Sequence, residues 1–373
     1  MSGATVTALT SGTALDQADR EVEQERRPRG NGAAPYVKIG VVAMITLAVT
    51  VVTLQIGAGG ITPSDAVQAI WAKLTGAVPA DPAQARLYTT VWELRVPRAG
   101  LALLGGAALA IAGVLFQGLL RNPLVSPFTL GIAPAAAFGA SLSILFFGSA
   151  GAAASGSALV GGALVTGLLC AAVVLGLAAT KRMQPTTLIL LGIALTQLFT
   201  ALTAALQYIA NEETLAAIVR WTWGTVNNAL WYQVIVLGVV LAVAVPYVQF
   251  RSSAVNAIAF AGDDAARSLG VPVTRIRLEL IAVAVLITSI TISFTGIIGF
   301  IGLVGPHIAR LVIGANHRFL LPFAALTGGL LLVVADAVGR VVLAPALVPA
   351  GIVDALIGAP VFLYLILARR RSL

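Results

Sequence analysis

The stretch GFIGLVGPHIAR, residues 299–310, decides the fold of this chain. It is apolar enough to enter a lipid bilayer, but it is too short and too rich in glycine to cross one as an ordinary helix. Its Gly305-Pro306 step removes a backbone donor, and His307 and Arg310 give it a polar end. Such a broken backbone survives in a membrane only where protein covers it or where it lines a water-filled cavity. The stretch therefore predicts a membrane protein with a pathway through it.

The composition of the whole chain predicts the same class. Hydrophobic residues make up 58% of the 373 residues, charged residues make up 10%, and the mean hydropathy is +0.96. Soluble domains usually carry about 25% charged residues, so we expect a polytopic membrane protein without a large soluble domain. The net charge of +8 does not indicate nucleic acid, because the basic residues stand at the ends of apolar runs. Cys170 lies inside such a run, and we expect it to be a buried, unpaired side chain.

Two regions differ in character. Residues 1–35 are polar and of mixed charge, which predicts a disordered tail, and residues 36–373 form the predicted membrane domain. We expect an all-α protein with about ten membrane segments, placed by a window of about 20 residues and by breaks at Pro, Gly and charge. The segments span approximately residues 37–57, 95–117, 126–147, 157–179, 187–209, 230–249, 277–296, 298–313, 320–339 and 351–368.

The distribution of basic residues predicts the orientation in the membrane. If the N-terminus lies in the cytoplasm, most Lys and Arg residues fall in cytoplasmic loops, as the usual bias requires. Both termini are then cytoplasmic, and the chain is a multi-pass protein of the cell membrane. The basic residues left outside are Lys73, Arg86, Arg95, Arg98, Arg220 and Arg340.

The polar residues of the segments argue against several classes of function. The acids Glu279, Asp336 and Asp354 stand near segment ends, whereas an ion-coupled carrier usually places an acid near the midplane. His307 and His317 are the only histidines, so no cluster has metal-ligand spacing, and we expect no metal site. A membrane enzyme would need a nucleophile and a base, for which the chain offers only a weak match. It also lacks a Walker-type phosphate loop, so ATP would be handled by a partner.

One loop has more pattern than a connector needs. Residues 252–271 begin with Ser253, which suits a helix cap, and Gly262 interrupts the first short helix. Asp263 and Asp264 suit the start of a second helix, and Gly270 suits its end. We interpret the pair as a docking platform on the cytoplasmic face. The alternative is an interfacial loop that rests on lipid.

Short motifs recur through the chain in a distinctive order. They occupy residues 94–98, 105–117, 121–124, 127, 130–131, 192–195, 221–224, 262–270, 299–310, 317–322, 335–336 and 351–360. Their order and spacing resemble those of the permease subunits of iron-siderophore and vitamin B12 importers of the ATP-binding-cassette class, the FecCD type. The resemblance covers about residues 37–370.

The resemblance implies a fold and a set of partners. The fold is a ten-helix subunit with two inverted halves, the type II importer fold, which dimerises with an identical or similar permease around a central pathway. The partners are cytoplasmic ATPase subunits, which bind the ATP, and an extracytoplasmic substrate-binding protein, besides membrane lipid. The chain itself needs no cofactor. The expected cargo is a ferric siderophore, with cobalamin or haem as alternatives within the family and an ion-coupled secondary transporter as the alternative outside it.

The resemblance also assigns roles to residues. Exposed arginines at the outer ends of the segments receive acids of the binding protein, with anchoring to lipid headgroups as the alternative; these are Arg95, Arg98 and Arg340. The platform that fits the ATPase contains Ser253, Gly262, Asp263, Asp264, Arg267, Leu269 and Gly270. The cytoplasmic gate and the pathway include Gln184, Pro185, Thr186, Thr196, Gln197 and Thr200. Pro185 stands where similar permeases have a small hydroxylated residue, and hydrogen bonding between helices is the other explanation of the polar stripe on the fifth segment.

Overall fold

The computed structural model describes residues 33–57, 60–79, 81–148, 152–180 and 184–369, and all regular structure within them is helical. Ten helices coincide with the ten predicted segments, so the predicted fold class is confirmed. They are α2 (Ala34–Thr53), α5 (Val96–Leu119), α6 (Ile132–Phe147), α7 (Ala152–Thr180), α8 (Pro185–Ile209), α10 (Trp231–Phe250), α13 (Val273–Thr295), α14 (Ile301–Ile313), α15 (His317–Val341) and α16 (Ala350–Arg369). The predicted tail lies almost wholly outside the described residues.

Shorter helices connect these segments. At one end of the bundle, α11 (Ser252–Asn256), η3 (Ala257–Ala261) and α12 (Asp263–Ser268) form what we call the platform. At the opposite end, α3 (Pro63–Thr75) and α4 (Pro82–Thr89) form a hairpin that continues through η1 (Thr90–Arg95) into α5. The sequence did not predict this hairpin, nor η2 (Pro127–Leu130) and α9 (Glu212–Thr222).

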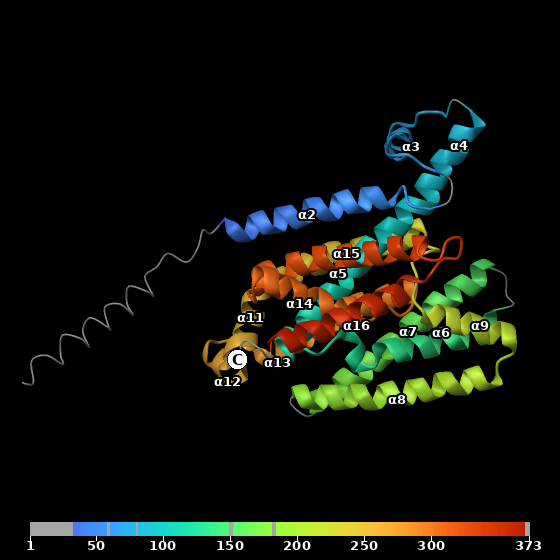
Figure 1. The fold of residues 1–373 in the computed structure, drawn as a ribbon. Coiled ribbons are helices and arrows are strands. Elements are labelled where there is room, and N and C mark those ends of the chain that lie inside the picture. The colour runs from blue at the N-terminus through green and yellow to red at the C-terminus, as the bar shows by residue number, and fades with distance from the viewer. Residues whose placement is uncertain (1–32, 58–59, 80, 149–151, 181–183, 370–373) are drawn as a thin grey trace, which may run out of the picture.

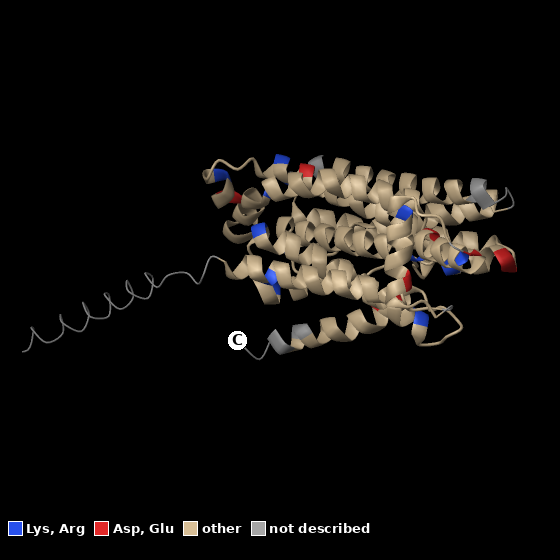
Figure 2. Ribbon diagram, turned by 90° about the horizontal axis from the view of Figure 1, so that it is seen from above, with Lys and Arg blue, Asp and Glu red and all other residues tan. Residues whose placement is uncertain are grey.

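The long helices run side by side along one common direction (Figure 1). Helix α2 lies along one edge of the bundle and α8 along the opposite edge, while the platform and the hairpin lie at its two ends (Figure 1). Charged residues gather toward these ends, as Figure 2 shows. A bundle with an apolar middle and charged ends is what a membrane-spanning protein requires, because charge in the hydrocarbon layer is costly.

Helix α5 forms the centre of the bundle and packs against α13, α14 and α15. It approaches both α14 and α15 closely: a Cβ atom added to Gly113 would meet the carbonyl group of Gly302, and one added to Gly106 would meet that of Gly328. Helices in lipid gain little from apolar contacts alone, so close packing between small residues holds them together. The glycine-rich segments of the sequence are the residues that allow this packing.

We expect Gly106→Ala to lower the free energy of unfolding by about 1–3 kcal/mol, because the added methyl group fits only if the backbone moves. Gly161→Ala on α7 is the matched control, since nothing lies within 4 Å of a Cβ placed there. Thermal unfolding of both purified variants in detergent measures the difference. Equal unfolding midpoints would contradict a packing role for Gly106.

The broken stretch at residues 299–310 forms most of α14 and is covered by protein, as predicted. Helix α14 packs against α5, α15 and α16, and Gly302, Val304 and Pro306 are buried. The backbone N–H of Phe300, just before the helix, donates to Oδ2 of Asp354 on α16 at 2.9 Å. A carboxylate at this position satisfies a backbone donor and favours the helix dipole. The short helix is therefore stabilised inside the bundle by an acid from a neighbouring segment.

Candidate functional site

The platform has the two short helices that the sequence predicted. Gly262 separates them with φ of 84°, a left-handed conformation that favours glycine. Asp263 and Asp264 occupy the first turn of α12, and Gly270 follows its end with φ of 81°. The exposed face of the platform carries five of the predicted residues, Ser253, Asp264, Arg267, Leu269 and Gly270.

One detail of the platform was predicted wrongly. Ser253 does not cap α11, because that helix begins one residue earlier and its N-cap position is Arg251, without a side-chain hydrogen bond. Arg251 is itself helical in conformation, with φ of −83° and ψ of 0°. Helix α11 follows α10 almost directly, so no extended residue precedes it and no serine can take the usual capping geometry.

A buried ion pair joins the platform to the centre of the bundle. Both oxygens of the Asp263 carboxylate accept hydrogen bonds from Arg277 on α13, at 3.0 Å from Nη1 and 2.8 Å from Nη2. The side chain of Arg277 is only 1% exposed, and its Nε donates to the carbonyl oxygen of Leu119 at 3.1 Å. Leu119 is the last residue of α5. A single guanidinium therefore connects the platform with two membrane helices through a bidentate pair, the strongest form of charged contact.

A second polar contact joins the platform to α15. Oδ1 of Asn256 accepts a hydrogen bond from the backbone N–H of His317 at 2.9 Å and lies 2.7 Å from Nδ1 of the same histidine. Nδ2 of Asn256 donates to Oδ1 of Asn316 at 2.9 Å. Asn316 is the N-cap residue of α15 and accepts a hydrogen bond from the backbone of Arg318. The platform is thus fixed to α5, α13 and α15 at once.

The ion pair is fully charged at neutral pH. The hydrogen bonds from Arg277 hold the pKa of the Asp263 carboxyl below its ordinary value of 3.8, and the charges of Arg267 and Arg121 act in the same direction. A lowered pKa in the folded state means that the contribution of this group to stability is complete above about pH 3.8. The contribution is lost only as the pH falls through the lowered value, so this contact does not respond to pH in the physiological range.

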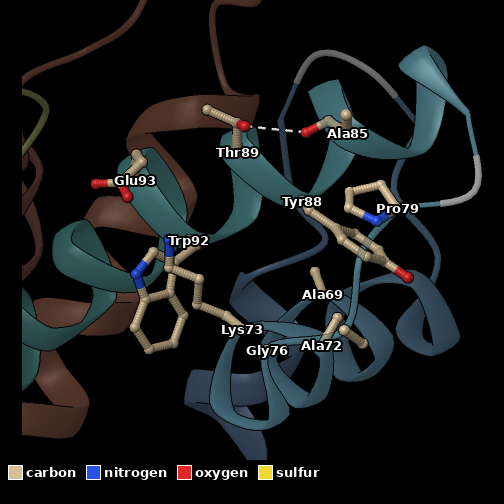
Figure 3. Close-up of a pocket in the computed structure, with 11 residues that line it drawn as sticks. Ala69, Ala72, Lys73, Gly76, Pro79, Ala85, Tyr88, Thr89, Trp92 and Glu93 are labelled. Carbon is tan, nitrogen blue, oxygen red and sulfur yellow. Dashed lines mark hydrogen bonds between the residues drawn. The ribbon is translucent and has the colours of Figure 1, made fainter.

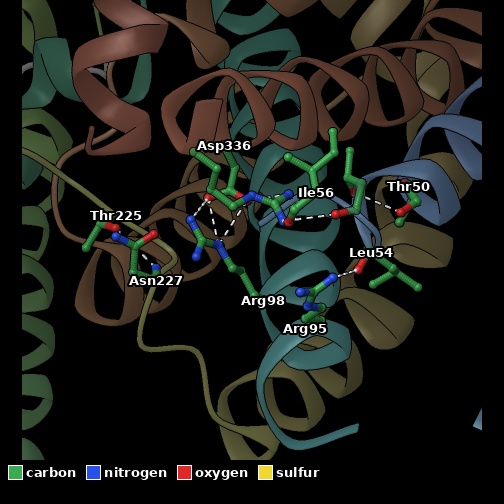
Figure 4. A network of polar contacts seen from close by, with 10 residues as sticks. Thr50, Leu54, Ile56, Arg95, Arg98, Thr225, Asn227 and Asp336 are labelled. Atoms are coloured by element: carbon green, nitrogen blue, oxygen red, sulfur yellow. Dashed lines mark hydrogen bonds and ion pairs between the residues drawn. The ribbon is translucent and has the colours of Figure 1, made fainter. Parts of the chain in front are cut away.

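The three arginines predicted for docking lie together at the hairpin end of the bundle (Figure 4). Nε of Arg98 donates to both oxygens of Asp336 at 3.0 Å, and its Nη2 lies 2.8 Å from Oδ1. Nη2 of Arg340 lies 3.2 Å from the other oxygen of the same carboxylate. Arg95 donates to the backbone carbonyl of Leu54. Asp336 is therefore shared by two arginines from α5 and α15.

The cluster also holds the end of α2. Nη1 of Arg340 donates to the carbonyl oxygens of Thr53 and Ile56, at 2.9 and 2.6 Å. Thr53 is the last residue of α2, and Leu54 and Ile56 follow it. No further turn of α2 therefore supplies backbone donors to the carbonyl groups of these three residues. Arg95 and Arg340 therefore cap the C-terminal end of the first membrane helix.

The expectation that these arginines are exposed was wrong. Arg95 is buried, and the side chains of Arg98 and Arg340 keep only 14% and 7% exposure, with internal partners. The sequence identified Asp336 only as an acid near a segment end. Its spacing of four residues from Arg340 on one helix was the signal for their pairing; the pairing with Arg98 crosses 238 residues and had no local signal. Arg277 and Asn256 were missed for the same reason.

Helix α8 presents polar groups on an exposed face. Gln197 and Thr200 are exposed, Thr196 is half-buried, and within the described residues neither exposed side chain has a hydrogen-bond partner. Thr203 on the same helix is buried and donates to its own backbone at Phe199. Unpaired polar side chains on a membrane helix favour contact with protein or water over contact with lipid.

The predicted gate lies at the start of the same helix. Gln184 is its N-cap residue, Pro185 is its first residue, and Gln184 and Thr186 are exposed. Proline is well accommodated in the first turn because its missing N–H has no partner there. Residues 181–183 of the predicted gate loop lie outside the described residues.

Comparison with known proteins identifies the class of membrane protein. Residues 45–368 match the FecCD transport family. An ABC transporter permease protein of Methanocaldococcus jannaschii is 41% identical over 284 residues, which cover 74% of this chain and 81% of the relative. The hemin transport system permease protein of Yersinia pestis is 36% identical over 283 residues, 76% of this chain and 84% of the relative.

A solved structure supports the same assignment. It is a metal-chelate type ABC transporter in an inward-facing conformation, and it matches with a TM-score of 0.76 at 31% sequence identity. The match covers 90% of this chain and 99% of that chain. By sequence and by fold, this chain belongs to the FecCD transport family of ABC transporter permeases, which are multi-pass membrane proteins.

Proposed function

We propose that this chain is the membrane-spanning subunit of an ATP-driven importer that carries a ferric siderophore across the cell membrane into the cytoplasm. The observation that supports this most directly is the buried pair of Asp263 and Arg277, which joins an external platform to the central helix α5. A rigid connection of this kind lets a force applied outside the bilayer move the helices inside it. The platform end, with both termini, would face the cytoplasm.

The proposed partner at the platform is an ATPase. Two exposed side chains there, Phe260 and Leu269, are apolar. The exposed Asp264 and Arg267 on the same platform are charged. Such a surface suits a cleft on a soluble protein, in which the apolar groups are buried and the charged groups lie at the rim. The permease would be moved by this partner and would hydrolyse nothing itself.

The proposed pathway runs along α8, between this chain and a second permease subunit. This placement is supported by Gln197 and Thr200, which are exposed midway along α8 among its apolar residues, whereas the exposed residues midway along α2 are all apolar, among them Val41, Met44 and Leu47. Lipid would cover α2, and protein or water would cover α8. Gln184, Pro185 and Thr186 would stand at the cytoplasmic end of the pathway.

We expect Gln197→Leu combined with Thr200→Val to lower cargo uptake several-fold while leaving the unfolding midpoint unchanged. The reason is that the two side chains have no partner within the described subunit, so their loss removes contacts with water or cargo only. Thr203→Val, on the buried face of the same helix, is the control and should leave uptake near the wild-type rate. Radiolabelled uptake into cells measures both variants. Unaltered uptake in the double variant would count against a pathway along α8.

The binding protein would dock at the hairpin end. The buried arginine cluster would hold that end in shape, and Arg98, whose side chain keeps 14% exposure, would be its most accessible member. Arg86 and Arg220 are exposed at this end and have no ion-pair partner among the described residues. We propose that these two arginines steer an acidic partner, a role in which exposed charge acts mainly on the association rate.

The proposed cargo is a ferric siderophore. Relatives carry names that specify hemin, cobalamin, iron(3+)-citrate, molybdate and iron(3+)-hydroxamate. Three of these five cargoes contain ferric iron in a chelate or porphyrin, and a ferric siderophore agrees with the metal-chelate type of the matched structure. A wrapped metal complex also needs no metal ligands from the pathway.

Uptake by cells that lack this chain tests the cargo. Labelled ferric hydroxamate, ferric citrate, haem, cobalamin and molybdate are supplied separately, with and without the chain restored from a plasmid. Restored uptake of a ferric chelate alone is the expected result. Restored uptake of cobalamin, haem or molybdate instead would replace the siderophore by that cargo and leave the role as a permease intact.

A further inference from the structure

We propose that α3 is an interfacial helix, which lies in the headgroup region of the bilayer at the hairpin end and inserts one apolar stripe into lipid. No role was assigned to this helix by the sequence or by the proposed transport mechanism. The proposal rests on the two faces of the helix, on its position beside the bundle and on the packing of its inner face.

The two faces of α3 are opposed. Ala66, Ala69 and Ala72 are buried, at 1%, 0% and 5% exposure. Val67 and Trp71, on the other side, are 59% and 67% exposed, and the next residue of that stripe, Leu74, is 70% exposed. Spacings of four and three residues place the stripe on a single helix face. A helix with one face buried in protein and a tryptophan-containing apolar stripe on the other needs an apolar environment for the second face.

The position of α3 places that stripe beside lipid. Helix α2 has 20 residues, enough to cross a hydrocarbon core of about 30 Å. Helix α3 begins ten residues after α2 ends, and in Figure 1 it lies at the level of that end and projects sideways from the bundle, on the edge away from α8. A helix that projects sideways at the end of a membrane span lies where the headgroups are.

The inner face of α3 packs on other parts of the protein, which leaves the stripe on the outside. Leu54, Ile61, Ala66, Ala69, Val91 and Ala99 form a small hydrophobic core of their own beneath it. Figure 3 shows Ala69 and Ala72 on the side of α3 that faces Tyr88, across a hollow of about 350 Å³. Thr62 and Asp65 form a capping box at the start of the helix. Both ends of the segment between α2 and α5 are thus fixed to the bundle.

The chemistry of the exposed face fits a lipid interface better than a protein partner. Tryptophan is enriched at membrane interfaces, where its ring is apolar and its N–H meets the headgroups. Lys73, in the last turn of α3, lies on the alanine side of the helix and lines the hollow with Trp92 and Glu93, so the stripe itself carries no charge. Gln68 and Thr75 flank the stripe on its polar side and are exposed. A stripe only three residues wide is also small for a stable contact between two proteins.

Depth measurements with spin labels test this placement on the full chain. The only cysteine, Cys170, is buried and free, and its replacement by alanine gives a background without thiols. Single cysteines are then introduced for labelling at Val67, Trp71, Leu74, Gln68 and Thr75. The labelled proteins are placed in nanodiscs of phosphatidylcholine and phosphatidylglycerol. Collision with oxygen, which concentrates in lipid, is compared with collision with a water-soluble nickel chelate.

We expect labels at Val67, Trp71 and Leu74 to collide more with oxygen than with nickel, and labels at Gln68 and Thr75 to show the reverse. This alternation follows the helix period and cannot arise from a general loosening of the hairpin. Greater collision with nickel at all five positions would place the helix in water and overturn the proposal. Immobilised labels at Trp71 and Leu74, shielded from both reagents, would also overturn it and would indicate a second copy of the chain. Neither outcome would affect the proposed transport function.

Discussion

Asp263→Asn is expected to lower the free energy of unfolding by about 3 kcal/mol and to abolish cargo transport, whereas Asp264→Asn leaves the free energy of unfolding near its wild-type value. The first change removes the counter-charge of Arg277, whose guanidinium is 1% exposed and cannot be hydrated in place. Breaking a buried ion pair costs about 3–5 kcal/mol. The lower end applies here because the Asp263 side chain is 28% exposed.

The control lies one residue away in the same helical turn. The Asp264 side chain is 99% exposed and pairs with Arg267 three residues later. Exposed pairs of this kind contribute less than about 1 kcal/mol. Unfolding in detergent and uptake in cells are measured for both variants. Equal behaviour of the two would contradict the anchoring role of Asp263.

A double variant separates stability from coupling. Asp263→Asn with Arg277→Met removes both charges, so no unpaired charge stays buried, and part of the lost stability should return. Transport should stay low, because the platform then lacks its bond to α5 and α13. Recovery of both properties together would show that the pair serves the fold and has no part in coupling.

Asp336→Asn is expected to have an effect of similar or larger size at the other end of the bundle. The carboxylate neutralises Arg98 and Arg340; Asp336 is buried, and the two arginine side chains are largely shielded from water. Without it, two guanidinium groups face each other with hydrogen bonds but no counter-charge, which should cost about 3–5 kcal/mol of stability. The yield of folded protein and the unfolding midpoint in detergent measure this effect.

The same geometry changes the expected result of reversing the arginines. Arg95→Glu with Arg98→Glu would place new carboxylates beside Asp336 and the carbonyl of Leu54. We expect this variant to lose transport because its fold is damaged. Arg220→Glu, at an exposed position, is the comparison and should weaken association with an acidic binding protein while the unfolding midpoint holds. A stable Arg95/Arg98 variant that fails only to bind this partner would restore the docking role to those two residues.

The membrane segments were predictable because their signal is local and physical. A bilayer demands a long apolar run for each ordinary crossing, and within the described residues seven helices are long and apolar enough to cross one. The shorter segments were located by the Pro, Gly and charged residues that bound them. The platform was predictable for a related reason, since Gly262 and Gly270 are needed where the backbone takes positive φ. Even the broken stretch was interpreted correctly, because lipid cannot cover an interrupted backbone.

The contacts between distant segments were not predictable from one sequence. Arg277 and Asp263 are 14 residues apart, and Arg98 and Asp336 are 238 residues apart, without a period that links them. When one apolar run is considered alone, an arginine at its end is expected to have an exposed side chain. The same side chain can be buried when an acid from another helix lies beside it. The hairpin at α3 and α4 escaped notice because a short amphipathic helix between two membrane segments has the composition of a loop.

Reconstitution of the purified chain in sealed vesicles tests the central claim most directly. The chain is inserted alone, or together with its ATPase subunits, and a cargo-loaded binding protein and ATP are supplied on the appropriate sides. Our account predicts cargo accumulation only with the ATPase and hydrolysable ATP, and its loss when Asp263→Asn replaces the wild-type chain. Accumulation by the chain alone, driven by a proton or sodium gradient, would contradict a permease that is moved entirely from its platform.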